Sequence, residues 1–186
     1  MNAQVVSKLD AREALNEVTA MEAHVGQTLT YLRDLAEHNT EGLAKFLNFM
    51  PLAYHRAEAS NEELAVVKLA TMVNEDCGPC LQINIRLAIM AGVNPELVRA
   101  VVEGRVDDIR DDGLRALYHY ANAVVRNTAD LAEHVDKVET MVGSTRLGDL
   151  AIAIASARVF PTLKKGMGHG VSCSVLNFDF EPESEL

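Results

Sequence analysis

The sequence predicts an all-α fold. Ala, Leu, Val and Glu dominate the 186 residues, whereas Gly and Pro are sparse, and such a composition favours helices over sheets. An acceptor residue followed three positions later by Glu, the pattern of a helix-capping box, occurs at 10–13, 60–63 and 130–133. Apolar residues at helical spacing, as over 114–125, are the third sign.

Residues typical of helix starts and helix ends give the order of the predicted helices. Gly92 and then Pro95 indicate the end of one helix and the start of the next. The segment 64–73 is apolar nearly all round apart from Lys68, so we expect its helix to be central. Pro161 predicts a kink or break in the last helix. The predicted helices cover residues 10–37, 41–57, 61–74, 78–91, 95–103, 113–127, 130–142 and 145–167.

Length and charge restrict the classes of function. The chain fits one helical domain, 1–186, with a core motif region at about 60–104 and an acidic tail at about 178–186. A net charge of -10 argues against nucleic-acid binding and gives no reason for adhesion to an anionic membrane. No secretory signal is evident, and the apolar run 150–160 is too short to span a bilayer. We therefore expect a cytoplasmic protein.

The segment Cys77-Gly-Pro-Cys80 is the one most directly tied to chemistry. Two thiols at this spacing on a first helical turn have Cα atoms about 5–6 Å apart, which a disulfide can bridge. Gly and Pro between them suit the start of a helix better than its interior. A helix N-terminus favours the thiolate, whereas Glu75 and Asp76 disfavour a second anion, so the sign of the pKa shift stays open. The alternative is a pair of buried, inert thiols.

The residues around this pair follow a recognisable order. An apolar helix runs from Glu62 to Asn74, the Cys pair follows, and a second helix leads to Gly-Val-Asn-Pro-Glu at 92–96. As a set, they resemble the carboxymuconolactone decarboxylase superfamily and, within it, the alkylhydroperoxidase D-like branch. The stretch 160–166 is also similar to that superfamily. A thioredoxin fold is disfavoured, because there the motif follows a strand, whereas here it follows a helical pattern.

The resemblance implies a multi-helix orthogonal bundle of the alkylhydroperoxidase D-like type that assembles as a homo-oligomer. It implies a peroxidase without a bound cofactor, in which one thiolate attacks a hydroperoxide and the partner thiol closes a disulfide. An external dithiol, such as a lipoyl group or a thioredoxin-like protein, then reopens that disulfide. Through this resemblance Cys80 attacks the peroxide and the more exposed Cys77 resolves. The electrostatics of a helix end would instead make Cys77 the more acidic thiol.

Two positions depart from the branch. It usually carries a His seven residues after the first Cys, and here that position is Asn84, which can hydrogen-bond a thiol or a water but cannot accept a proton near neutral pH. The branch also places a Glu one helix earlier in a proton relay. Glu63 or Glu62 is the candidate here, and a capping box with Ser60 is an equal alternative for Glu63. We expect Glu75 to be a solvated loop charge.

Other residues offer weaker alternatives. His119 could supply a substitute base, although a packed or solvent-facing role is commoner for such a His. His169 and Cys173, joined with Cys77 and Cys80, would make a Cys₃His zinc site, but their wide separation differs from compact zinc modules, so we expect no metal. Two further hypotheses stay open: a decarboxylase or lactone-type proton-transfer enzyme that does not use the thiols, and a non-enzymatic zinc-stabilised or oligomeric helical scaffold.

Overall fold

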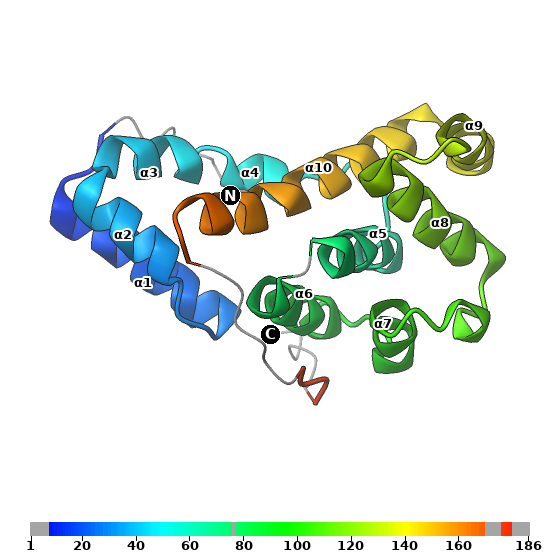
Figure 1. Ribbon diagram of the computed structural model, residues 1–186, viewed down its shortest axis with the longest axis horizontal. Coiled ribbons are helices and arrows are strands. Elements are labelled where there is room, and N and C mark those ends of the chain that lie inside the picture. The colour runs from blue at the N-terminus through cyan, green and yellow to red at the C-terminus, as the bar shows by residue number, and fades with distance from the viewer. Residues whose placement is uncertain (1–7, 76, 170–175, 180–186) are drawn as a thin grey trace.

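The computed structural model describes residues 8–75, 77–169 and 176–179, which form an all-α bundle without any strand in these ranges (Figure 1). The predicted fold class is therefore confirmed. None of the described helices combines the length and the apolarity needed to cross a bilayer. The helices are α1 (Ala11–Val25), α2 (Thr30–His38), α3 (Thr40–Leu47), α4 (Met50–Ala53), α5 (Asn61–Asn74), α6 (Gly78–Met90), α7 (Pro95–Val102), the 3-10 helix η1 (Val106–Asp108), α8 (Asp112–Arg126), α9 (Leu131–Val142) and α10 (Ser144–Gly166).

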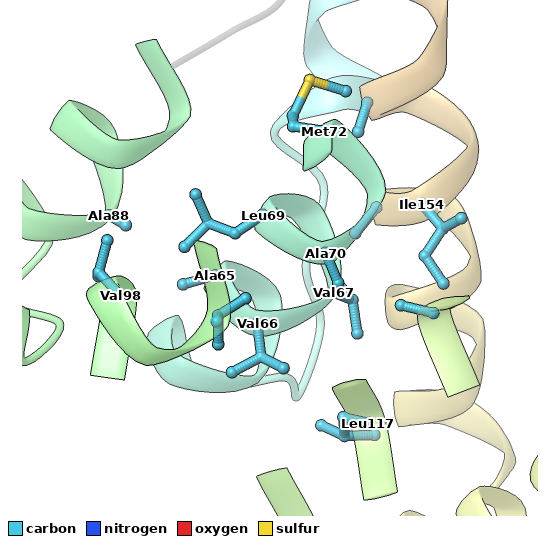
Figure 2. Packing of buried hydrophobic residues seen from close by; sticks show 14 of the residues in the cluster. Ala65, Val66, Val67, Leu69, Ala70, Met72, Ala88, Val98, Leu117 and Ile154 are labelled. Carbon is cyan, nitrogen blue, oxygen red and sulfur yellow. The ribbon is translucent and has the colours of Figure 1, made fainter. Parts of the chain in front are cut away.

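Helix α5 is the centre of the larger core, as its apolar sequence predicts. Helices α6, α7, α8 and α10 all pack against it. Figure 2 shows Ala88 of α6 and Val98 of α7 on one side of α5, Ile154 of α10 on another side, and Leu117 of α8 on a third. Burying each large apolar side chain contributes about 1.5–3 kcal/mol, so this helix fixes the positions of its neighbours.

Helices α1, α2 and α3 enclose a second, smaller apolar cluster at the left end of the molecule in Figure 1. Ile83 of α6 and Leu163 of α10 pack against this cluster, while other residues of the same two helices belong to the larger core. In Figure 1, α10 runs from α9 past α5 toward α4. The C-terminal part of α10 and the first half of α6 therefore lie where the two clusters meet.

Two predicted helices are each divided in the structure. The predicted helix 10–37 is interrupted after Val25, because Gly26 has a left-handed φ of 68° that ends α1. The positive φ disfavours any residue with a Cβ at this position, and a Cβ there would also require the guanidinium group of Arg86 to move. The predicted helix 41–57 is divided into α3 and α4, since Pro51 lies in the first turn of α4 and has no N–H to continue the ladder of α3.

Two local predictions near α9 and α10 are wrong. Helix α10 continues through Pro161 without the expected break, because Pro161 is buried and apolar contacts hold the helix on both sides of it. The capping boxes at Asp10 and Ser60 are confirmed. The expected box at Asp130 is absent, since its carboxylate accepts a hydrogen bond from the Thr128 hydroxyl at 2.5 Å instead.

A buried carboxylate joins α10 to the segment that precedes α5. Asp149 is only 2% exposed. Its Oδ2 oxygen accepts hydrogen bonds from the backbone N–H groups of Ala57, Glu58 and Ala59, at 2.8, 2.7 and 3.0 Å. His55 Nε2 lies 3.4 Å from Oδ1. Burial alone would raise the pKa of Asp149, but these N–H groups and His55 hold it below its ordinary value.

We expect Asp149→Asn to lower the free energy of unfolding by about 3 kcal/mol at neutral pH, because a buried amide is a weaker acceptor and its NH₂ group gains no partner. Urea denaturation followed by circular dichroism measures this loss. The folded-state pKa is depressed, so the contribution of Asp149 is fully present above the unfolded-state pKa of about 3.9 and is lost as pH falls through the folded-state value.

The exposed Asp112, which pairs with Arg115 on the surface of α8, is the matched control for this prediction. Asp112→Asn should change the unfolding free energy little, because exposed ion pairs contribute little. Equal losses in the two variants would contradict the role given to Asp149.

Candidate active site

The turn between α5 and α6 places the two thiols at the start of α6. Cys77 is the N-cap residue of that helix, and Gly78 and Pro79 occupy its first turn, as predicted. The missing N–H of Pro79 does no harm there, since the first N–H groups of a helix have no partner within it. The Cys77 carbonyl accepts the N–H of Leu81 at 2.9 Å, so the first helical turn closes around the pair.

Both thiols are reduced and buried. Cys77 is 4% exposed and Cys80 is 7% exposed. The two thiols are nearly equally shielded from solvent, so exposure does not distinguish a resolving thiol. The two thiols lie close enough for a hydrogen bond, which is the largest single cause of the shifted pKa of each. Neighbouring thiols in this arrangement can be joined by a disulfide.

The hydrogen bond between the thiols separates their pKa values. It is the largest cause that lowers the pKa of Cys77, to about 6, against the opposing effect of burial. The nearby N–H of Cys80 and the positive charges of Lys164 and Lys165 lower it further. The same hydrogen bond, together with burial, raises the pKa of Cys80. These shifts favour the thiolate on Cys77 and the protonated thiol on Cys80.

The last turns of α10 supply the cations at this site. Lys164 Nζ lies 4.0 Å from Cys77 Sγ. Lys165 Nζ lies 3.7 Å from a Glu75 carboxylate oxygen and also donates to the Glu75 carbonyl. Arg158 Nε donates to the other carboxylate oxygen of Glu75 at 2.8 Å. Three of these five side chains come from α10, and the other two come from the turn between α5 and α6, which is far from α10 in the sequence.

Glu75 is thus not the solvated loop charge that we expected. Its side chain is 13% exposed and is held by the two cations from α10. Because they offset its charge, Glu75 opposes the thiolate less than its sequence position suggests. Sequence reasoning singled out the stretch 160–166 but missed its two lysines, whose relevance depends on where α10 ends in space.

Tyr31 of α2 is a further residue that sequence reasoning missed. It is 5% exposed and belongs to the smaller apolar cluster. Burial raises its pKa, and electrostatic interaction with the thiol pair raises it further, which places the phenol near the thiols. The phenol therefore remains neutral. No motif in the sequence marks this Tyr, since only the packing of α2 brings it to the site.

Asn84 lies one turn beyond Cys80 on α6. Its amide Nδ2 donates to the Cys80 carbonyl at 2.9 Å. The predicted neighbourhood is confirmed, but this hydrogen bond is made to the backbone and not to a thiol. Asn84 thus supports the first turns of α6 and supplies no base.

Glu63 lies at the opposite end of α5 from the thiols. Asn74 lies eleven positions further along the helix, a rise of about 16 Å. Its carboxylate accepts the Ser60 N–H at 2.7 Å, and its own N–H donates to the Ser60 hydroxyl at 3.1 Å. Arg146 Nη1 is 3.4 Å from its other oxygen. The capping role is therefore confirmed, and the structure does not bring Glu63 to the thiols as a relay.

Neither candidate histidine joins the thiols. The His119 ring stacks on His134 of α9, with centroids 6.1 Å apart. Burial lowers the pKa of His119, and the nearby His134 and Lys137 lower it further. His169 contacts α2 through Asp34, at 2.6 Å. Cys173 lies outside the described residues, within which no group of three metal-ligating side chains occurs.

Comparison with known proteins does not assign a family. No family model, no curated protein and no solved structure matches the chain. The resemblance carried by residues 62–96 therefore stays a prediction, and the chemistry of the site is argued from its geometry.

We expect Lys164→Gln to raise the pKa of Cys77 from about 6 toward the ordinary thiol value of about 8.5, because the variant removes the closest positive charge. The pH dependence of iodoacetamide alkylation, mapped to Cys77 by peptide mass spectrometry, measures this pKa. Lys45→Gln on the surface of α3 removes the same charge far from the site and should leave the profile unchanged. An unshifted profile in Lys164→Gln would remove Lys164 from the site.

Proposed function

We propose that this protein is a thiol-dependent oxidoreductase that reduces small hydroperoxides. The observation that carries the proposal is the pair of thiols at the start of α6, with Lys164 Nζ 4.0 Å from Cys77 Sγ. The neighbouring thiol and the lysine charges lower the pKa of Cys77 to about 6. The thiolate is the nucleophilic form of cysteine, and a second thiol within bonding reach can trap its oxidised product. Ionisation at neutral pH and an adjacent resolving thiol are the two properties that a two-cysteine peroxidase requires.

The reaction balances with the two thiols as the only electron source. The Cys77 thiolate attacks one oxygen of the hydroperoxide, the O–O bond breaks, and the departing alkoxide takes a proton to leave as an alcohol. Cys77 is now a sulfenic acid, oxidised by two electrons. The Cys80 thiol attacks this sulfur, the S–O bond breaks, and water leaves as the disulfide forms. An external dithiol then reduces the disulfide by exchange.

We assign the attack to Cys77, although the family resemblance assigns it to Cys80. Cys77 carries the charge, whereas the raised pKa of Cys80 keeps its proton in place until the sulfenic acid has formed. This arrangement needs no base near the thiols. The Cys80 hydrogen bond and the Lys164 ammonium stabilise the thiolate, which is consistent with Asn84 in the position where the branch usually carries His.

Burial of the pair restricts the substrates that we propose. Because the thiols are 4% and 7% exposed, hydrogen peroxide reaches them more readily than a bulky organic hydroperoxide. For the same reason we favour a slender dithiol, such as a lipoyl group, over a thioredoxin-like protein as the reductant.

Treating the reduced protein with hydrogen peroxide tests the proposal. Intact mass spectrometry should show the loss of two hydrogens, and peptide mapping should show a Cys77–Cys80 crosslink. Cumene hydroperoxide should react more slowly, because the thiols are buried. Recovery of the unchanged reduced mass after prolonged treatment with hydrogen peroxide would refute the peroxidase function.

A pair of serine variants assigns the roles of the two thiols. Cys80→Ser should retain the nucleophile and accumulate a sulfenic acid at Cys77, which dimedone labels, whereas Cys77→Ser should react far more slowly. The two variants make the same atomic change one turn apart, so each is the control for the other. Labelling of Cys80 in Cys77→Ser at the faster rate would reverse the assignment.

A further inference from the structure

A cavity of about 330 Å³ lies between α5 and α6, at the low end of the size range of small-molecule sites. Part of its lining is apolar and is formed by Leu64 of α5 together with Leu87 and Met90 of α6. Neither Cys77 nor Cys80 lines it. The cavity is therefore separate from the thiol pair, and an inference about its ligand does not rest on the proposed peroxidase function.

Both formally charged residues that line this cavity are basic. Lys68 of α5, Arg56 from the segment before α5, and His24 at the end of α1 contribute to the lining, and no Asp or Glu does. This is notable in a chain with a net charge of -10, in which acidic side chains outnumber basic ones. A local excess of positive charge in a concave site attracts anions.

Lys68 is the anchor that an anion would use. Its Nζ donates to the Ala53 carbonyl at 3.0 Å, and no carboxylate pairs with it among the described residues. Because an ammonium group has three N–H donors, donors remain for a ligand. Burial lowers the pKa of Lys68, as expected for a cation removed from water without an anionic partner. A bound carboxylate would supply that partner.

We propose that this cavity binds a short-chain alkanoate, whose carboxylate bonds to Lys68 and whose hydrocarbon chain packs on the apolar lining. The combination of cationic and apolar side chains selects this class. A fully polar anion such as phosphate would leave the leucine and methionine surfaces without a partner, and a neutral hydrocarbon would leave the ammonium group without one.

Isothermal titration calorimetry of the wild-type full chain with hexanoate and with hexanamide tests this inference. The two probes share their hydrocarbon chain and differ in charge. Hexanoate should bind, and hexanamide should bind about tenfold more weakly or worse, because a charge-assisted hydrogen bond is replaced by a neutral one. Equal affinity for the two probes, or no binding of hexanoate up to about 10 mM, would overturn the proposal.

Comparing hexanoate binding by the variants Lys68→Met and Lys45→Met tests whether the carboxylate binds at Lys68. Each removes one positive charge and keeps an unbranched side chain, but Lys45 lies on the surface of α3 and pairs with Glu41. Lys68→Met should weaken hexanoate binding about tenfold or more, whereas Lys45→Met should bind as the wild type does. Undiminished binding by Lys68→Met, or equal weakening in both variants, would contradict the proposed site. The comparison of the two probes on the wild-type protein needs no variant, so it decides the question even if Lys68→Met does not fold.

Discussion

The apolar surface of α5 is the constraint on which the rest of the structure depends. Val66, Val67 and Leu69 point in different directions around this helix, and each is at most 1% exposed. Such a helix is stable in water only when other helices cover every side of it. Helices α6, α7, α8 and α10 provide that cover. The turn that follows α5 therefore lies beside α10, and Cys77 is buried at the end of this turn.

The end of α5 is held in place by polar contacts as well as by packing. Asn74 donates to Asn122 at 2.8 Å and accepts from Arg126 at 2.6 Å, both on α8. The turn thus has a fixed start, and α6 begins at Gly78, three residues beyond Glu75. Because this geometry is fixed, the Cys80 thiol, although a weak donor, can make a hydrogen bond that shifts the pKa of Cys77. The neighbouring thiol and the lysine charges together lower the pKa of Cys77 to about 6, which favours the thiolate.

The sequence was sufficient for features that depend on neighbouring residues and insufficient for those that depend on distant ones. The bounds of α5, α6 and α7 were predicted to within a residue, because Ser60, Gly78-Pro79 and Asn94-Pro95 set helix ends locally. Lys164 and Arg158 lie at the site only because α10 packs against α5. No local sequence pattern predicts that packing. Periodicity likewise placed His119 on a helix face without revealing that this face meets α9.

We propose that the protein stabilises the reduced pair by holding Cys77 as a thiolate. The reduction potential of the Cys77–Cys80 couple is the most direct test of this proposal. Stabilising the reduced form makes a dithiol couple more oxidising, so we predict a potential above that of thioredoxin, about -270 mV, in equilibrium with a dithiol buffer of known potential. A potential well below that value, or the absence of any disulfide under oxidising conditions, would contradict the account.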